Sequence, residues 1–496
     1  FLFCQFNKRC GVLFSSSVFL FIFLPVVLIC YFLLEKKFKN VFLLAASIFF
    51  YAYGEPRVVI IMICMIIVSY ICSSGVRYYI YKNKIYAKMF VIFACIFDIF
   101  VLCVYKYLNF IIYNINNIFG DVVRQTNILL PIGISFFTFQ SISYIIDIYR
   151  EEKEKLYDNV YVKKQNRCFF SENPINVALY ISMFPQLVAG PIVRYETIAR
   201  ELKDRSISWS DFCAGTERFV IGLCKKILLA NTLAVAADRA FAQDPASMSI
   251  LMAWLGMVCY TFQIYFDFSG YSDMAIGLGR MFGFHYDENF NYPYISRTIT
   301  EFWRRWHISL STWFRDYVYI PLGGSRVRPV RHIFNLFVVW VLTGIWHGAA
   351  YNFIAWGFLY FVLLASEKFI IHPERFRNML LKAVYMIFAI TSVMFLWVIF
   401  RSPSLEIGIN YIGACFGIFD NVSYDGTSLF LFHENIIVLI IAAFCATPVL
   451  SQMINKIKEC RYGSVLNGIR YVCLMFLFLC AVSYLVIGAH NPFIYF

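Results

Sequence analysis

Apolar runs long enough to cross a lipid bilayer recur along this chain, and they constrain its fold more than any other feature. Of its 496 residues, 60% are hydrophobic and 15% are charged, whereas an average soluble domain is roughly 25% charged. Backbone groups at membrane depth must form their hydrogen bonds within the protein, and long unbroken runs favour helices over a barrel. The sequence therefore predicts an all-α polytopic membrane protein.

The apolar runs predict about eleven transmembrane helices. Three further apolar stretches, 106–119, 128–147 and 176–193, are interrupted or bounded by Pro or Gly. We expect them to be spans or re-entrant elements around a membrane-embedded cavity. No internal repeat is visible, which argues against a transporter built from inverted repeats. The predicted spans are residues 17–35, 41–53, 57–75, 88–106, 217–238, 248–268, 333–349, 351–370, 381–401, 434–450 and 469–488.

The formal net charge of +13 would suggest nucleic-acid binding in a soluble protein. Here the lysines and arginines gather in loops between the apolar runs, which is the positive-inside pattern of membrane proteins. Such loops also attract anionic lipid or an anionic substrate. We therefore expect the lipid bilayer, and no nucleic acid, among the partners. Two polar segments, 150–176 and 402–434, are expected to be loops on opposite faces, the first of them cytoplasmic.

Motifs that would define several other classes of enzyme are missing. The sequence has no Walker A loop, no GxGxxG at a strand-to-helix turn, no HExxH and no GxSxG. None of the 16 cysteines forms a CxxC pair, and most lie in apolar runs as small hydrophobic residues. We therefore expect no metal site and no bound cofactor, and ATP hydrolysis and hydrolase chemistry are not supported.

The stretch 298–319 has the spacing of a single amphipathic helix that lies at the membrane interface. His307 sits beside its apolar face. From this pattern alone an interfacial anchor is favoured over a catalytic role, because Trp and Arg gather at headgroup level. The apolar face would hold Phe302, Trp306, Leu310, Trp313 and Tyr317, and the polar face Arg304, Arg305, Ser309, Thr312 and Arg315.

His347 is the only ionisable residue between 338 and 350, inside an apolar run. An ionisable group at membrane depth is a functional-site hypothesis by default. The small residues around it would let helices pack closely, and a packed, desolvated imidazole stays neutral near pH 7, as a general base must. A histidine hydrogen-bonded between two helices fits the pattern equally well. Trp346 and Asn352 lie nearby and are candidate substrate-binding residues.

Other polar residues also lie in apolar surroundings. Gln263, Asp267 and Asp273 fall in one run and could orient an imidazole, line a polar cavity or contact a substrate. Pairing of the two carboxylates with an arginine of the 298–319 segment is the simplest alternative. Gln186 lies in a stretch rich in Pro and Gly, which predicts a broken, re-entrant element.

Five segments together resemble the membrane-bound O-acyltransferase family, and most of all its bacterial branch that O-acetylates exported polysaccharides such as alginate. The resemblance runs from about residue 14 to the C-terminus and rests on long motifs. These are LPIGISFFTFQSISYIIDIYR (130–150), FPQLVAGPIVRY (184–195), FQIYFDFSGYSDMAIGLGRMFGF (262–284), NFNYPYISRTITEFWRRWHISLSTWFRDYVYIPLGGSR (289–326) and LTGIWHGAAYNFIAWG (342–357).

The resemblance implies a single transmembrane domain over 14–496, with a catalytic core at about 128–370 around a membrane-embedded cavity. Residues 1–13 would be an N-terminal extension with no indicated role, and the 150–176 segment is longer than is typical. His347 would be the catalytic histidine deep in the cavity. His307 would be the second active-site histidine, nearer the cytoplasm.

The implied acyl donor is acetyl-CoA or another cytoplasmic thioester, used as a substrate. Arg304, Arg305 and Arg315 would suit its phosphates. Neutral His347 would remove a proton from the attacking hydroxyl or take the acetyl group itself, while His307 positions the donor or assists the leaving thiolate.

The implied enzyme lies in the bacterial inner membrane and O-acetylates an exported cell-envelope polysaccharide. It would act directly, through an extracytoplasmic SGNH-type acetyltransferase, or within a polysaccharide export complex. The same fold could instead transfer D-alanine to teichoic acid, or an acyl group to a lipid or protein. A proton- or ion-coupled transporter using Asp147, Asp267 and Asp273, or a scaffold without catalysis, are the alternatives from other classes.

Overall fold

The computed structural model describes residues 13–157, 173–188, 190–459, 463–488 and 490–492. Within those ranges every regular element is a helix, which confirms the predicted fold class. The chain divides into two compact units, one formed by residues 1–217 with 275–287 and the other by residues 218–274 with 288–496. Helices α11 (Trp209–Cys224) and α13 (Ile250–Met281) contribute to both units.

Nine helical segments in the described ranges are long and apolar enough to cross a bilayer, and each matches a predicted span. The remaining two predictions, 17–35 and 41–53, coincide with an apolar helix over Phe19–Leu33 and with the 16-residue α3 (Lys39–Gly54). At 1.5 Å per residue, 16 residues reach about 24 Å, less than the roughly 30 Å hydrocarbon core. The count of eleven is therefore not confirmed. The nine segments are α4 (Val59–Tyr79), α5 (Lys84–Lys106), α11 to α12 (Trp209–Phe241), α13, α16 (Pro329–His347), α17 to η8 (Tyr351–Arg375), α18 (Met379–Arg401), α20 (Gly426–Cys445) and most of α22 (Val465–Val486).

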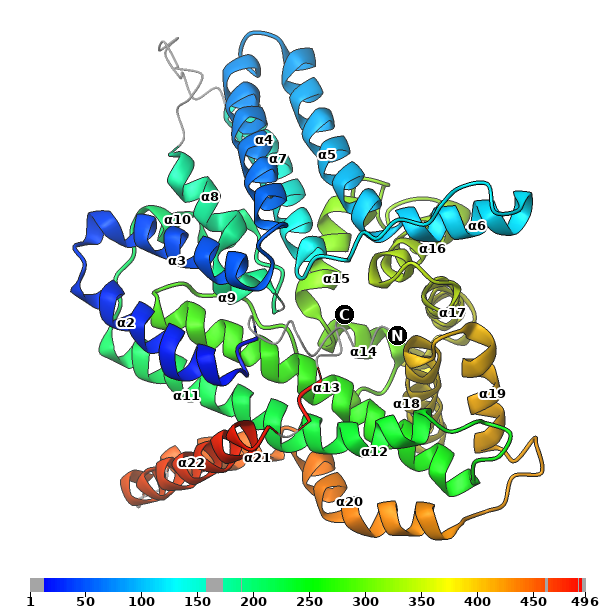
Figure 1. Cartoon of the computed structure of the whole chain (residues 1–496). Helices are drawn as coiled ribbons and strands as arrows, with labels where there is room; N and C mark the ends of the chain where they lie inside the picture. Colours follow the sequence, from blue (N-terminus) through cyan, green and yellow to red (C-terminus); the bar gives the residue numbers. More distant parts are fainter. Residues whose placement is uncertain (1–12, 158–172, 189, 460–462, 489, 493–496) are drawn as a thin grey trace. The chain divides into compact units, whose positions relative to one another are not determined.

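In the first unit, α4, α5 and α7 (Ile134–Tyr157) pack side by side (Figure 1). Ser141 joins all three helices, since its hydroxyl lies 2.6 Å from that of Ser69 on α4 and donates to Asp98 on α5. The predicted loop 150–176 begins late, because α7 continues to Tyr157, and residues 158–172 lie outside the described ranges. The other elements are η2 (Phe19–Phe23), α2 (Leu24–Leu33), η3 (Lys36–Phe38), α3, α6 (Leu108–Phe119), α8 (Pro174–Ser182), α9 (Phe184–Leu187) and α10 (Tyr195–Lys203).

In the second unit, α16 and α17 (Tyr351–Ser366) pack against each other along their length (Figure 1). Gly344 and Gly357 meet at the crossing, where a Cβ on Gly344 would lie 2.4 Å from the carbonyl oxygen of Phe353. Only glycine permits this approach. The other elements are η4 (Lys225–Ala230), α12 (Asn231–Phe241), η5 (Pro293–Ile295), η7 (Glu367–Ile371), η8 (Pro373–Arg375), α18, α19 (Leu405–Cys415), α20, α21 (Val449–Glu459) and α22 (Gly463–Val486).

The prediction of one continuous helix over 298–319 is wrong. The segment forms α14 (Ile299–Arg305), α15 (Ile308–Phe314) and η6 (Arg315–Tyr319). The break falls at Trp306, which is extended, and at His307, which has the left-handed φ of 43°. At the break the Ile308 N–H donates to the backbone carbonyl of Asn289 at 2.9 Å. This turn buries Trp306, His307 and Ser309. The other four residues of the expected polar face are not buried: Arg304, Arg305, Thr312 and Arg315.

Candidate active site

The two predicted histidines both neighbour one indole ring in the second unit. The ring of Trp346 has its centroid 4.8 Å from that of His347 and 6.2 Å from that of His307. His347 ends α16, whereas His307 occupies the break between α14 and α15. Two histidines that are 40 positions apart in the sequence thus share one aromatic neighbour, and Trp346 belongs to the site as the sequence suggested.

His347 lies at the end of its membrane helix and not within it. It is half-buried, so the expectation of a fully packed imidazole is wrong. The rings of Trp356 and Phe400 meet the imidazole edge to face, each with its centroid at 5.0 Å.

Asn352 supports this arrangement from the start of α17. Its side chain is buried and donates to the backbone carbonyl of Ser402 at 2.9 Å and to that of Ile399 at 3.4 Å. Both carbonyls belong to the end of α18, beside Phe400. Asn352 therefore holds in place the turn that packs Phe400 on His347, and its predicted contact with a substrate stays a prediction.

His307 is buried, with 1% of its surface exposed, so the interfacial-anchor interpretation is wrong. Its ring meets Phe268 edge to face at 4.6 Å. Burial lowers the pKa of His307 to about 3, because a charged imidazole would lose its hydration there. The ring is accordingly neutral at physiological pH.

Three residues around His307 were absent from the sequence-based candidates. Asn289 Oδ1 lies 3.0 Å from His307 Nδ1 and 2.8 Å from the Ser309 hydroxyl, and Asn289 Nδ2 donates to the Ser272 hydroxyl at 2.9 Å. Asn289 is itself 1% exposed. It opens one of the quoted motifs, but no spacing rule links residues 289 and 307, so the sequence offered no signal for their contact.

The three predicted donor-binding arginines have different surroundings. Arg304 and Arg315 line a groove of about 250 Å³ together with Lys368, which the sequence did not suggest, and the groove has an apolar floor that includes Trp303 and Trp340. Arg305 is not among its lining residues.

Their counter-ions differ as well. Arg305 pairs with Glu301 at 2.9 Å, and Arg315 pairs with its neighbour Asp316 at 2.7 Å. In the part of the chain that the structure describes, Arg304 and Lys368 take part in no ion pair. These two cations therefore have charge available for an anionic ligand.

The carboxylates on α13 pair with lysines and an arginine from the preceding helical segment. Asp273 lies 2.9 Å from Arg218 and 2.7 Å from Lys225, and Asp267 pairs with Lys226. The alternative of pairing is thus confirmed, but the predicted partner, an arginine of the 298–319 segment, is wrong.

The two predicted glutamines have different surroundings. The side-chain oxygen of Gln263 is buried and has no hydrogen-bond partner among the described residues. Gln186 lies in α9 of the first unit, where it donates to the backbone carbonyl of Tyr180. The short α8 and α9 around it match the predicted broken element.

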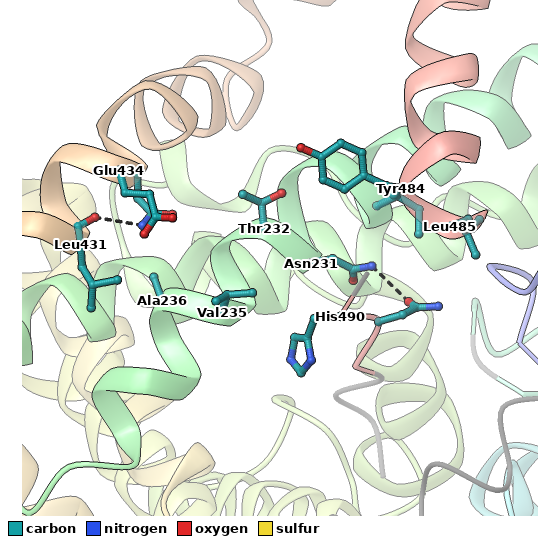
Figure 2. Close-up of a pocket in the computed structure, with 12 residues that line it drawn as sticks. Asn231, Thr232, Val235, Ala236, Leu431, Glu434, Tyr484, Leu485 and His490 are labelled. Carbon is teal, nitrogen blue, oxygen red and sulfur yellow. Dashed lines mark hydrogen bonds between the residues drawn. The ribbon is translucent and has the colours of Figure 1, made fainter. Parts of the chain in front are cut away.

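A second cavity of about 190 Å³ lies where α12, α20, α22 and residues 490–491 meet (Figure 2). Asn231 donates to Asn491 at 3.1 Å across it, and His490 lies 2.9 Å from Asp238. The wall also includes Thr232 and Glu434. The sequence analysis proposed no site here.

The all-helical fold agrees with the comparisons. The sequence model of the membrane-bound O-acyltransferase family matches residues 115–407. The chain belongs to this family, and it is a multi-pass membrane O-acyltransferase.

Its relatives include a probable alginate O-acetylase, AlgI, of Pseudomonas aeruginosa, 41% identical over 82% of this chain and 75% of the relative. A peptidoglycan O-acetyltransferase of Helicobacter pylori is 34% identical over 82% of this chain and 81% of the relative. A teichoic acid D-alanyltransferase of Bacillus subtilis is 31% identical over 49% of this chain and 60% of the relative. The resemblance found in the sequence is thereby confirmed.

Proposed function

We propose that this enzyme transfers acetyl groups from acetyl-CoA to an exported cell-envelope polysaccharide and that it works in the bacterial inner membrane. Relatives named for O-acetylation of alginate and of peptidoglycan align over 82% of the chain, which supports acetyl transfer to a glycan. The relative named for D-alanyl transfer aligns over 49%. D-Alanyl transfer is therefore the second candidate.

The observation that carries the proposal is that both imidazoles neighbour the indole ring of Trp346. In the proposed reaction His347 accepts the proton of the acceptor hydroxyl as its oxygen attacks the thioester carbonyl. The carbon–sulfur bond then breaks, and the thiolate of coenzyme A leaves with the proton that His347 holds. His307 neighbours the same indole ring and would contact one of the two reactants.

The groove beside α14 supports an anionic donor. The phosphates of acetyl-CoA would lie against Arg304 and Lys368, and its apolar arm against the aromatic floor. Trp303 of that floor packs on Trp356 at 5.7 Å, and Trp356 packs on His347. The groove and the proposed catalytic histidine thus share one aromatic wall.

On the outer face, the acetyl group would pass to the polysaccharide directly, through an extracytoplasmic SGNH-type acetyltransferase, or within an export complex. The prediction that 402–434 is a loop is wrong in part, because the segment holds α19 and the start of α20. The segments 242–249 and 402–425 contain no Lys or Arg, as expected on the face opposite the basic loops. They adjoin each other, since Ile250 and Leu251 donate to the carbonyls of Val422 and Ser423. A partner that receives the acetyl group would meet the enzyme on this face.

The test uses membranes that contain the full-length protein, radiolabelled acetyl-CoA, and the polysaccharide with its candidate acetyltransferase partner. We expect His347→Ala to abolish label transfer at unchanged protein level, because the proton acceptor is lost. His433→Ala is the matched control, since His433 is an exposed histidine of the same unit. Wild-type transfer by His347→Ala would refute the assignment.

The donor site has its own test. Replacing Arg304 and Lys368 by Gln should raise the KM for acetyl-CoA about tenfold or more, since charged hydrogen bonds contribute about 1.5–3 kcal/mol each. The kcat should change little. Arg297→Gln is the control, because Arg297 is an exposed arginine outside the groove. An unchanged KM in the double variant would place the donor elsewhere.

A further inference from the structure

The backbone at His307 is held in a conformation that residues with a Cβ rarely adopt. Its φ of 43° and ψ of 55° are left-handed, which costs on the order of 1–3 kcal/mol unless the surroundings impose it. Two backbone hydrogen bonds impose it here, from Ile308 N–H to the Asn289 carbonyl and from Asn291 N–H to the Arg305 carbonyl, each 2.9 Å. The 289–291 segment therefore determines where the imidazole lies.

The hydrogen-bond partners of the Asn289 side chain show which way its amide group is oriented. Besides His307 Nδ1, the backbone N–H of Ser309 points to the same amide atom at 3.3 Å. A backbone N–H can only donate, so that atom must be the oxygen, and the amide NH2 then donates to Ser272. If the amide were reversed, its NH2 group would face the backbone N–H of Ser309, and two donors would meet.

This orientation decides which ring nitrogen of His307 carries the proton. A carbonyl oxygen only accepts, so the group that faces it across 3.0 Å must be an Nδ1–H. A neutral imidazole has one proton, and Nε2 then carries a lone pair. The Ser309 hydroxyl does not change this assignment, because its contact with Asn289 Oδ1, at 2.8 Å, is shorter than its 3.4 Å contact with the ring.

We infer that Asn289 is a positioning residue that fixes His307 as the Nδ1–H tautomer and so makes Nε2 a hydrogen-bond acceptor. The inference deepens the proposed function and rests on it for the reaction itself. With its only proton held by Asn289, the imidazole accepts a hydrogen bond from an N–H or O–H of a reactant. It does not protonate the departing thiolate. Of the two roles that the sequence left open for His307, positioning of a reactant is the one that fits.

The direct test is nitrogen NMR of the full-length protein in lipid, with 15N-labelled histidine. The chain has seven histidines, and the difference spectrum against His307→Gln identifies the signals of His307. We expect its Nδ1 signal at the position of a protonated ring nitrogen and its Nε2 signal at that of an unprotonated one. A protonated Nε2 in the wild-type protein would overturn the inference. This measurement needs no substrate and stands apart from the acetyl-transfer assay.

Three variants connect the tautomer to turnover. Asn289→Leu removes the acceptor and should lower kcat about a hundredfold, because a misplacement of about 1 Å in a positioning group can cost that much in rate. Asn289→Asp keeps an oxygen against Nδ1 and should retain both the tautomer and most of the activity. Ser272→Ala is the control, since it removes the contact of the amide NH2 and leaves Oδ1 in place.

The combined outcomes separate the two proposals. Loss of activity in Asn289→Leu with an unaltered His307 tautomer would contradict the positioning role. A wild-type protein with the expected tautomer and no histidine-dependent acetyl transfer would refute the proposed function and leave the tautomer assignment intact. If Asn289→Leu does not fold, the wild-type spectrum and Asn289→Asp still decide the matter.

Discussion

Replacing Gly344 with alanine would test how closely α16 and α17 must approach for the site to work. A Cβ on Gly344 would lie 2.4 Å from the carbonyl oxygen of Phe353 and 3.2 Å from the Cα of Gly357. Carbon–oxygen contacts between packed helices are ordinarily about 3.3 Å or more, so the helices must separate by about 1 Å. Overpacking of this kind typically costs about 1–3 kcal/mol.

The same displacement should also lower the rate of catalysis. α17 carries Trp356, whose ring lies 5.0 Å from that of His347, and α16 ends at His347 itself. A shift of about 1 Å between them moves the imidazole relative to its aromatic wall, and misplacement on that scale can cost about a hundredfold in rate. We therefore expect Gly344→Ala to lower both the unfolding temperature and the kcat of acetyl transfer.

The assay measures thermal unfolding of the detergent-solubilised protein and turnover in proteoliposomes, with Gly468→Ala as the matched control. A Cβ on Gly468 of α22 meets nothing within 4 Å, so this substitution should cost no activity. It should add up to about 1 kcal/mol of stability, because alanine favours a helix over glycine. Wild-type turnover in Gly344→Ala, whatever its unfolding temperature, would refute the link between the helix crossing and catalysis.

Two further predictions concern stability. Lys226→Met should destabilise the protein by about 3–5 kcal/mol, because Asp267 loses its ion-pair partner in a buried site, and adding Asp267→Leu should restore much of the loss in thermal unfolding. His307 has a folded-state pKa lowered to about 3 from an unfolded value of about 6.5. The contribution of neutral His307 to the free energy of unfolding is therefore fully present above pH 6.5 and declines by about 1.4 kcal/mol per pH unit as pH falls towards 3. The stability of His307→Gln should thus depend less on acid than that of the wild-type protein. Equal acid dependence of the two proteins would contradict the burial argument.

Hydropathy predicted the membrane helices well, because a bilayer imposes a length and an apolar composition on each span. The nine confirmed segments are helical over 19 to 33 residues. The predictions at 17–35 and 41–53 were not confirmed, because hydropathy counts apolar residues and does not locate where a helix ends. α3 ends at Gly54, and α2 ends at Leu33, just before a turn of charged residues.

The site was predicted in its residues and not in its geometry. His307, His347 and Trp346 came from motifs, and the structure brings them together. The break at His307 could not be predicted, because the helical spacing of aromatic residues continues through Trp306. Tertiary contacts with Asn289 override that local pattern. Contacts between residues 18 positions apart in irregular structure leave no periodic signal in a sequence.

The domain boundaries proposed from the sequence, with a core at about 128–370, stay a prediction. The family match over 115–407 and the division into two units describe different properties of the chain. Residues 1–12 and 158–172 lie outside the described ranges, so the N-terminal extension and most of the long polar segment also keep their predicted status.

The pairing of Asp267 and Asp273 bears on the transporter alternative. Lys225 and Lys226 are adjacent in sequence and yet reach carboxylates six positions apart on α13. They do so from the π-helical η4, beside a close approach in which a Cβ on Gly222 would lie 2.5 Å from the carbonyl oxygen of Gly270. Both carboxylates form ion pairs with lysines that the fold places beside them.

A proton path needs a carboxylate that gains and loses its proton as the protein works. A buried carboxylate that is bound to a lysine favours its charged form, and protonating it would leave the lysine charge unpaired at a cost of several kcal/mol. These carboxylates therefore fit fixed links between α13 and the segment before it. That leaves His347, the half-buried ring at the end of α16, as the candidate proton acceptor in this unit, with His307 as its neutral, buried positioning partner.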